Sequence, residues 1–307
     1  MINILYAGSA EKWPDYQKHL PPALAEAGLK AQLSCDLGPA EVDYIVYAPN
    51  GPISDFTPFT RAKAVMSLWA GVEKIVGNRT LTMPLTRMVE DGLTDGMLEW
   101  VVGHTLRHHL GLDGHITRQD GVWRGTPPPI ARDRKVGLLG LGALGKAAAQ
   151  ALAALNFDLM GWSRSPKSLD GIPTVSGEDG LDQVLRRSEI LILLLPLTPE
   201  TDYLLNAERL ARLPDGAVIL NPGRGPLIDD TALLKALDRL GHATLDVFRI
   251  EPLPPEHPFW AHPKITVTPH VAADTRAPGA AKVVAENIRR AEAGAPLLHR
   301  ADLKRGY

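Results

Sequence analysis

The chain has 307 residues, 45% of them hydrophobic and 22% charged, a composition typical of a globular protein long enough for two domains. Its 33 basic and 35 acidic side chains give a formal net charge of −2, and this argues against a nucleic acid partner because such partners are held by a basic face. The single cysteine excludes an intramolecular disulfide and a thiolate metal cluster.

The first ninety residues alternate between strand-like and helical segments. We expect strands at Ile2–Ala7, Val42–Ala48 and Ala64–Leu68, and a helix at Tyr16–Ala27 that ends before Gly28. The chain runs directly into the first strand without a basic leader, and its apolar runs are too short to cross a bilayer. We therefore expect a cytoplasmic protein that has no membrane partner.

A long helix is predicted after Thr94, because apolar residues recur there at helical spacing. His104 and His108 lie four residues apart on it, with His109 adjacent, and this spacing can bind a divalent metal. Since no third ligand is evident, we interpret them as solvated or interface side chains and expect no metal. The run Pro127–Pro129 then breaks the helical pattern and is interpreted as a hinge.

The middle of the chain predicts a doubly wound α/β domain, in which buried strands alternate with helices. The predicted helices are Ala143–Leu155, Leu181–Arg187 and Thr231–Leu240. The predicted strands are Lys135–Leu139, Asp158–Trp162, Ile190–Leu195, Ala217–Leu220, Ala243–Val247 and Ile265–Thr268.

A last helix, Ala280–Ala293, could return to the first domain. The fold class is therefore α/β, with two Rossmann-like or flavodoxin-like domains, parallel sheets and a cleft between them. We predict that residues 1–95 and 277–307 form a substrate (catalytic) domain and that residues 96–276 form an NADP-binding Rossmann domain.

A glycine-rich turn links the strand at Lys135–Leu139 to the next helix, with glycines at positions 140, 142 and 145. Gly140 allows a tight turn, Gly142 lets the backbone approach a pyrophosphate, and Gly145 permits close packing of helix on strand. The free N–H groups and positive end of the helix would hold the phosphates. This pattern, strand before and helix after, predicts a dinucleotide site.

The residues that end the second strand of this domain favour NADP(H) over NAD(H). Sites for NAD usually place a carboxylate there to accept a hydrogen bond from the ribose 2′-hydroxyl. Here Ser163 occupies the place, 23 residues after Gly140, and no carboxylate follows. Arg164 can bind a 2′-phosphate as a fork-shaped donor, with Ser163, Ser165 and Lys167 adding hydrogen bonds.

Three later strands each end in a polar residue that suits reduction of a keto acid, namely Arg224, Glu251 and His270. Ligands of open α/β sheets bind beyond the carboxyl ends of the strands, so we expect the three to meet in one crevice. Arg224 would clamp the substrate carboxylate and polarise the carbonyl group. Protonated His270 would donate to the developing alkoxide, and Glu251 would favour and orient the imidazolium.

The chain resembles the D-isomer-specific 2-hydroxyacid dehydrogenase family, most closely its glyoxylate/hydroxypyruvate reductase A group. The resemblance covers nearly the whole chain and is carried by Leu68-Trp69-Ala70-Gly71-Val72, the glycine-rich turn, Trp162-Ser163-Arg164-Ser165, the Asn221-x-x-Arg224-Gly225 segment, Glu251-Pro252-Leu253-Pro254, His257-Pro258-Phe259-Trp260, Pro269-His270 and Arg305-Gly306-Tyr307. One departure is Pro222-Gly223, where the family more often has a bulkier residue followed by Ala or Ser.

The resemblance implies an NADP-dependent homodimer that reduces short 2-keto acids, such as glyoxylate and hydroxypyruvate, to (R)-2-hydroxy acids. It assigns the catalytic roles to Arg224, Glu251 and His270, and it places the helix after Thr94 in the dimer interface. It implies that the substrate is bound by Trp69, Ala70, Gly71, Val72, Arg224 and His270. Further cofactor contacts are expected at Ala143, Leu144, Leu195, Pro196, Pro222, Gly223, Asp246 and His270.

Other interpretations stay open. A related dehydrogenase could act on formate, phosphite or a bulkier keto acid, and a nucleotide-sensing, corepressor-like binding protein would share the scaffold. The sequence shows no long docking segment, which favours the enzyme. Trp123 and Trp260 could line the substrate cleft, but large aromatic residues are more often core or interface residues, so we assign neither to specificity.

Overall fold

The computed structural model describes residues 1–303 and divides into two compact units. Unit 1 consists of Met1–Leu93 and the segment from Asp274 onward, and unit 2 consists of Thr94–Ala273. The chain thus passes between the units at 93/94 and 273/274, whereas the sequence predicted domain borders at 95/96 and 276/277. The Arg305-Gly306-Tyr307 motif lies outside the described residues.

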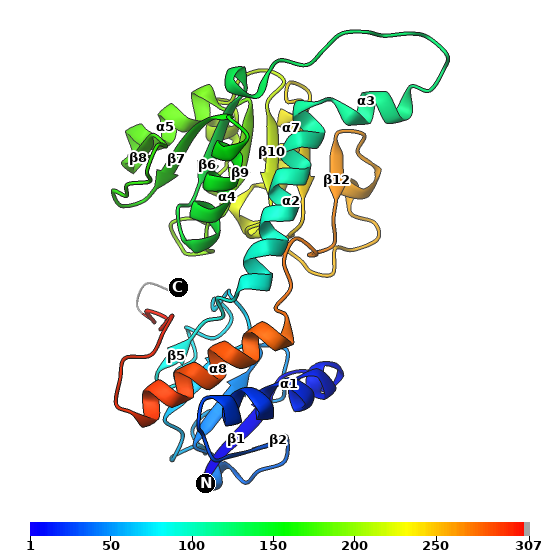
Figure 1. Cartoon of the computed structure of the whole chain (residues 1–307). Helices are drawn as coiled ribbons and strands as arrows, with labels where there is room; N and C mark the ends of the chain where they lie inside the picture. Colours follow the sequence, from blue (N-terminus) through cyan, green and yellow to red (C-terminus); the bar gives the residue numbers. More distant parts are fainter. Residues whose placement is uncertain (304–307) are drawn as a thin grey trace. The chain divides into compact units, whose positions relative to one another are not determined.

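Unit 1 contains a five-stranded parallel sheet in the order β2-β1-β3-β4-β5, the flavodoxin-like order. Its strands are β1 (Ile2–Ala7), β2 (Ala31–Ser34), β3 (Tyr44–Tyr47), β4 (Ala64–Ser67) and β5 (Leu85–Thr86). Figure 1 shows α1 (Trp13–Glu26) beside α8 (Ala277–Glu292), and buried side chains of both helices pack on the sheet. Leu20 and Leu24 of α1 meet Val284 and Ile288 of α8 in this core. Long-range packing therefore returns the end of the described chain to the first unit.

Unit 2 contains a seven-stranded parallel sheet in the order β12-β11-β10-β9-β6-β7-β8, which includes the Rossmann order. The strands are β6 (Lys135–Leu139), β7 (Asp158–Ser163), β8 (Thr174–Ser176), β9 (Ile190–Leu193), β10 (Val218–Asn221), β11 (His242–Leu245) and β12 (Ile265–Val267). The helices are α2 (Asp91–His109, whose first three residues belong to unit 1), α3 (Leu112–Thr117), α4 (Ala143–Ala154), α5 (Gly177–Arg187), α6 (Ala207–Leu210) and α7 (Asp230–Ala236). The predicted fold class, α/β with two parallel sheets, is confirmed.

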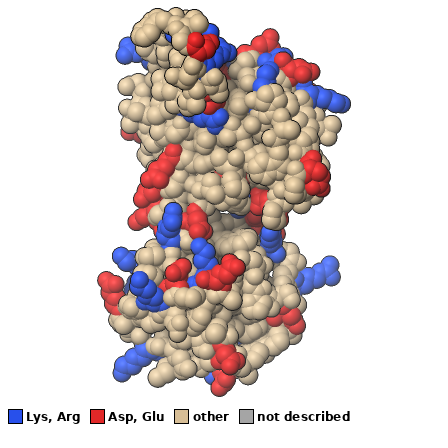
Figure 2. All heavy atoms as spheres, turned by 90° about the vertical axis from the view of Figure 1, so that its right-hand side faces the viewer, with Lys and Arg blue, Asp and Glu red and all other residues tan. Residues whose placement is uncertain are grey.

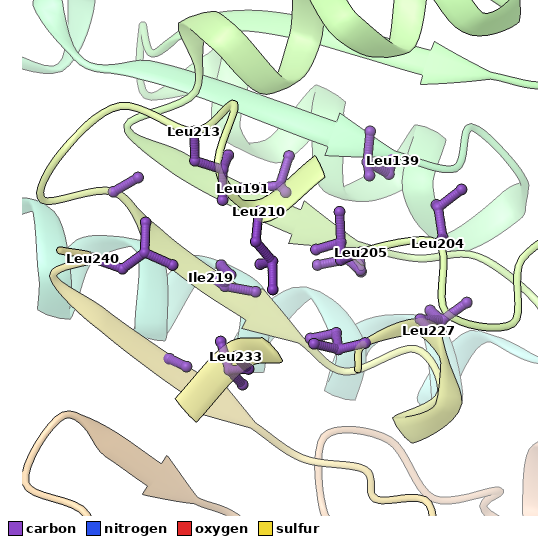
Figure 3. Close-up of a cluster of buried hydrophobic side chains, with 14 of the residues drawn as sticks. Leu139, Leu191, Leu204, Leu205, Leu210, Leu213, Ile219, Leu227, Leu233 and Leu240 are labelled. Atoms are coloured by element: carbon purple, nitrogen blue, oxygen red, sulfur yellow. The ribbon is translucent and has the colours of Figure 1, made fainter. Parts of the chain in front are cut away.

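One core of unit 2 is built almost entirely from leucine and isoleucine. Figure 3 shows Leu139 of β6, Leu191 of β9 and Ile219 of β10, which belong to one buried cluster with Leu210 of α6 and Leu233 of α7. All five side chains are fully buried. This continuous apolar packing fixes the carboxyl ends of the central strands, from which the functional loops emerge.

Several sequence-based expectations differ from the structure. The helix predicted after Thr94 begins at Asp91, and the last helix begins at Ala277, with Pro278 in its first turn, where proline is tolerated. The short strands β2, β5 and β8 were missed. Pro127–Pro129 was interpreted as a hinge, but it lies within unit 2, in an exposed extended segment.

Among residues 1–303, no helix is both long and apolar enough to cross a membrane. Basic and acidic side chains are interspersed on the face shown in Figure 2, and neither sign dominates a large area of it. Ligands of parallel sheets bind beyond the carboxyl ends of the strands, so the functional site is expected at these edges of the two sheets.

Candidate functional site

The glycine-rich turn between β6 and α4 is shaped to admit a ligand. Gly140 has a φ of +104°, which favours glycine, and its N–H donates to the Trp162 carbonyl oxygen at 2.9 Å. A Cβ at Gly145 would collide with the Gly140 carbonyl oxygen. At Gly142, the N-cap of α4, a Cβ would meet nothing within 4 Å in the described part of the chain apart from its own neighbours and helix. Open space thus lies beside the N-terminus of α4, where a pyrophosphate would fit.

The turn lies where the strand order of the sheet reverses, between β6 and β9. Leu195 and Pro196 follow β9. Pro222 and Gly223 follow β10, which pairs with β9 on the side away from β6. A Cβ at Gly223 would lie 2.8 Å from the Leu193 carbonyl oxygen. This close approach favours glycine at position 223. The first turn of α4 contributes Ala143 and Leu144 to the same edge.

Two cations lie near the end of β7. The guanidinium of Arg164 is half exposed and lies 3.9 Å from the carboxylate of Glu200, a loose contact between two exposed groups. Lys167 Nζ donates to the Leu141 carbonyl oxygen at 2.9 Å, which brings its charge to the glycine-rich turn. The Ser163 hydroxyl is 5% exposed and donates to a backbone carbonyl two residues further on, at 2.7 Å. It therefore shapes the loop that presents Arg164.

His270 and Glu251 form a hydrogen-bonded pair after β12 and β11. His270 Nδ1 lies 2.8 Å from Glu251 Oε2, and Glu251 Oε1 accepts from the Phe248 N–H at 2.9 Å. The His270 side chain remains 51% exposed, so its other ring nitrogen is accessible to a ligand. His270 has a φ of +53°, a left-handed conformation that turns the chain sharply after Pro269.

The pair favours a charged state of both side chains. The hydrogen bond that the His270 imidazolium donates to Glu251 raises the pKa of the imidazole, against the opposing effects of burial and of the Arg224 charge. Burial acts to raise the pKa of the Glu251 carboxyl, but hydrogen bonds from His270 and the Phe248 N–H, together with nearby positive charge, lower it. The arrangement thus stabilises an imidazolium that can donate a proton.

Arg224 is delivered by a constrained loop after β10. Asn221 Nδ2 donates to the Arg224 carbonyl oxygen at 2.9 Å, and Asn221 Oδ1 accepts from the Gly223 N–H at 3.1 Å. Arg224 Nη1 donates to the Gly223 carbonyl oxygen at 2.7 Å. A Cβ at Gly225 would collide with the backbone of Phe248, so this glycine lets the β10 loop lie directly against the loop that leads to Glu251. The three residues predicted from the sequence are therefore brought to one edge of unit 2.

Asp246 fixes the segment that carries His270. Its carboxylate is 1% exposed and accepts from the Thr268 hydroxyl at 2.6 Å and from the N–H groups of Val271 and Ala272 at 3.0 and 2.9 Å. The His270 N–H donates to the Asp246 carbonyl oxygen at 2.8 Å. The sequence predicted Asp246 as a cofactor contact, whereas in the structure its carboxylate positions the histidine loop.

Comparison with known proteins places this geometry in a family. The family model for the "D-isomer specific 2-hydroxyacid dehydrogenase, NAD binding domain" matches residues 103–272. The chain belongs to the D-isomer specific 2-hydroxyacid dehydrogenases. It is 36% identical to the glyoxylate/hydroxypyruvate reductase A of Serratia proteamaculans (strain 568), with 97% of each chain covered. The resemblance inferred from the sequence is thus confirmed, and the protein is an oxidoreductase of this family.

Solved structures of the family superpose on the whole chain. A D-isomer specific 2-hydroxyacid dehydrogenase from Xanthobacter autotrophicus Py2, in complex with NADPH and MES, has a TM-score of 0.92 at 39% identity and covers 100% of this chain and 99% of its own. The NADPH-dependent glyoxylate/hydroxypyruvate reductase from Sinorhizobium meliloti, in complex with NADP and sulfate, has a TM-score of 0.85 at 36% identity, with both chains covered completely.

The loop that the sequence predicts for the substrate carboxylate follows β4 of this dehydrogenase and belongs to unit 1. Trp69 N–H donates to the Ser67 hydroxyl at 3.1 Å, and the Trp69 carbonyl oxygen accepts from the Met88 N–H at 2.9 Å. Val72 is buried in the core below the loop, which leaves Ala70 and Gly71 as its partly exposed centre. The loop is thus anchored at both ends.

The sequence predicted solvated or interface side chains for the histidines of α2, and in the structure His104 and His108 are half-buried and His109 is buried. His109 is 6% exposed and packs edge-on against Phe157. His108 Nε2 lies 2.9 Å from the Thr244 hydroxyl of β11, and its ring lies 5.0 Å from that of His242. Within residues 1–303, no group of three or more His, Cys, Asp or Glu side chains is arranged to hold a metal. These histidines are packing elements of unit 2.

Sequence reasoning missed one link to the histidine loop. Trp100 Nε1 of α2 donates to the Thr268 hydroxyl at 3.1 Å, and Thr268 in turn donates to Asp246. Thr268 was predicted only as the last residue of the strand Ile265–Thr268, and its partner on α2 is distant in sequence. Of the two tryptophans left unassigned, Trp123 is 96% exposed in the segment after α3, and Trp260 is half exposed and donates to the Pro254 carbonyl oxygen at 3.0 Å.

Proposed function

We propose that this dehydrogenase reduces small 2-keto acids, such as glyoxylate and hydroxypyruvate, to (R)-2-hydroxy acids with NADPH. The observation that carries the proposal is the His270–Glu251 pair at the same sheet edge as the glycine-rich turn and Arg224. The reductase relatives in Serratia and Sinorhizobium support the substrate class.

In the proposed mechanism, unit 2 is the cofactor-binding domain and unit 1 is the substrate domain. The bound nicotinamide supplies the hydride that adds to the carbonyl carbon of the keto acid. His270, held as an imidazolium by Glu251, donates its proton to the carbonyl oxygen, so that an alcohol forms and the ring becomes neutral. Arg224 binds the substrate carboxylate and polarises the carbonyl group. The loop at residues 69–72 is the part of unit 1 that we assign to substrate binding, through its N–H groups.

The preference for NADPH is assigned to the residues after β7. Arg164 would bind the 2′-phosphate, with Ser163, Ser165 and Lys167 completing the site. No carboxylate occurs between Ser163 and Lys167 to repel the phosphate. The complexes of the Xanthobacter and Sinorhizobium proteins with NADPH and NADP support this assignment. Gly140, Gly142 and Gly145 would admit the pyrophosphate.

A steady-state assay tests both parts of the proposal. The oxidation of NADPH and of NADH is followed with glyoxylate, hydroxypyruvate, pyruvate and phenylpyruvate, for the wild type and for Arg164→Ala. We expect turnover with the small keto acids and NADPH, and a KM for NADPH that rises far more in Arg164→Ala than the KM for NADH. Failure to turn over any of the four acids contradicts the substrate class, and equal effects on both cofactors contradict the role of Arg164.

We also propose that the protein is a homodimer whose interface includes α2 and the segment after it. That segment exposes large apolar side chains, with Ile116 at 70%, Val122 at 59% and Trp123 at 96% exposure. An apolar surface of this kind favours a protein partner. The family resemblance implies that α2 lies in the dimer interface. Light scattering should give twice the chain mass, and Trp123→Asp should shift it toward the monomer. A monomeric wild type would contradict the proposal.

A further inference from the structure

Glu90 is a buried carboxylate in unit 1, three residues before the point at which the chain first passes into unit 2. It is 5% exposed and follows β5 by four residues. Its Oε2 accepts from the Gly92 N–H at 2.8 Å, and its Oε1 accepts from the Leu93 N–H at 2.7 Å and from the Arg276 N–H at 3.1 Å. One side chain therefore binds the backbone of both segments through which the chain leaves and re-enters unit 1.

Both of these segments begin a helix, and this makes the site favourable for a carboxylate. Gly92 and Leu93 lie in the first turn of α2, and Arg276 is the N-cap of α8. N–H groups without helical partners and the positive ends of two helix dipoles thus converge on one negative charge. Such charge-assisted hydrogen bonds are stronger than those between neutral groups.

The surrounding sequence leaves room for this carboxylate. A Cβ at Gly279, in the first turn of α8, would collide with Glu90 Oε2. A Cβ at Gly92 would lie 3.2 Å from Glu90 Oε2 and 2.8 Å from Arg276 Cγ. A glycine on each helix therefore faces the carboxylate, and the absence of a side chain at both positions leaves the space that the carboxylate occupies.

The same two segments hold the substrate loop. The Thr275 hydroxyl donates to the Leu68 carbonyl oxygen at 2.7 Å, and the Met88 N–H donates to the Trp69 carbonyl oxygen at 2.9 Å. Thr275 adjoins Arg276, and Met88 precedes Glu90 by two residues. The carbonyl groups of Leu68 and Trp69 are thus hydrogen-bonded to residues next to Arg276 and Glu90, in the two connecting segments.

We propose that Glu90 is a positioning residue for keto acid reduction. Its carboxylate binds the two connecting segments together at their ends in unit 1, an arrangement that we call the clasp. Through Met88 and Thr275, the clasp holds the Trp69–Val72 backbone in place for the substrate carboxylate. The inference rests on the proposed function for its kinetic consequence. Its structural content, the clasp, is independent of which substrate is reduced.

The test uses two variants of the full-length protein and a matched control. Glu90→Ala removes all three acceptor bonds. Glu90→Gln keeps the shape but turns an amide donor toward N–H donors, so at least one bond is lost. The control is Glu41→Gln, because Glu41 also accepts from a backbone N–H in unit 1, that of Gly38 at 3.2 Å, but at an exposed site.

We expect the KM for the keto acid to rise about tenfold or more in both Glu90 variants, since charge-assisted bonds that order the loop are lost. The Kd for NADPH, measured by fluorescence titration, should stay within about twofold because its proposed site is in unit 2. Amide hydrogen exchange should accelerate at residues 68–72, 91–93 and 275–277 in the free protein. Glu41→Gln should change none of these quantities.

Unchanged KM and unchanged exchange in Glu90→Gln would overturn the proposal. A parallel loss of kcat, NADPH affinity and thermal stability would also overturn it, because it would show a general structural role. If the wild type reduces no keto acid, the proposed function fails, and the exchange measurement alone decides whether Glu90 clasps the two segments and the loop.

Discussion

Unit 2 contains histidines in two kinds of surroundings, which shift the pKa of the imidazole in opposite directions. At the carboxyl edge of the sheet, His270 is half exposed and bound to Glu251, and its pKa is raised. On the face covered by α2, burial lowers the pKa of His108 to about 3 and that of His242 to about 4, with nearby positive charge as a further cause. The partners that contact these two rings are threonine hydroxyls rather than carboxylates.

The difference shows how a fold assigns work to one residue type. A carboxylate partner and access to solvent keep an imidazole protonated and able to reach a ligand, as catalysis requires. A neutral hydroxyl partner and burial keep it neutral, so that it serves as a packing group. Each of the following experiments breaks or sharpens this contrast.

The largest effect is expected from His270→Ala. Removal of the proton donor should lower kcat for keto acid reduction by about 10²–10⁴-fold, the usual contribution of general acid catalysis. The measurement is NADPH oxidation at saturating keto acid. His262→Ala, another histidine of unit 2, is the control and should retain activity. A His270→Ala variant with nearly normal kcat would show that another group supplies the proton.

The buried histidines should make the protein sensitive to acid. Above pH 6.5 they are neutral in the folded and unfolded chains and cost nothing. As the pH falls below 6.5, the unfolded chain takes up protons first, so stability falls by at most about 1.4 kcal/mol per pH unit for each histidine. The loss levels off near pH 4 for His242 and pH 3 for His108, where the folded state also becomes protonated.

Urea unfolding between pH 7.5 and 4.5 measures this slope. In His108→Gln the slope should be smaller, because one of the groups that binds a proton only on unfolding is gone. The neighbouring charges, Arg107 and Asp113, remain in the variant. An identical slope in wild type and variant would contradict the assignment of acid sensitivity to these rings.

Glu251→Gln should convert His270 toward the behaviour of an ordinary histidine. Without the carboxylate, the raised pKa of His270 should fall toward the ordinary value of a histidine. Reduction requires the imidazolium, so activity is lost as the pH rises through this pKa, and the loss should occur at lower pH in the variant. At any pH on the descending limb of the wild-type profile, the rate should therefore be lower in the variant. A pH–rate profile with an unmoved descending limb would show that Glu251 does not hold the proton on His270.

Both groups of histidines show what can be read from the sequence. Lys135–Leu139 was predicted as a strand and is β6. Arg224, Glu251 and His270 were expected at the carboxyl edge of the sheet because each of them follows a buried apolar run. In contrast, β5 has only two residues, too few to show a period, and it forms by pairing with β4. The low pKa of His108 comes mainly from its burial, and its hydrogen-bond partner Thr244 lies more than a hundred residues away in the sequence. Local patterns thus predict strand ends, whereas long-range partners decide which histidine is charged.

The smallest effect is expected from Thr244→Val, which keeps the shape of the fully buried Thr244 but removes the hydroxyl near His108. The His108 ring nitrogen then loses its partner, which should lower the free energy of unfolding by about 1 kcal/mol at pH 7.5. Because His108 is neutral and distant in role from His270, kcat should not change. Thr266→Val is the matched variant for His242, although it also removes an acceptor of Arg107. A loss of kcat comparable to that of Glu251→Gln would show that the two histidine groups are coupled, and the contrast between a catalytic and a packing histidine would then not hold.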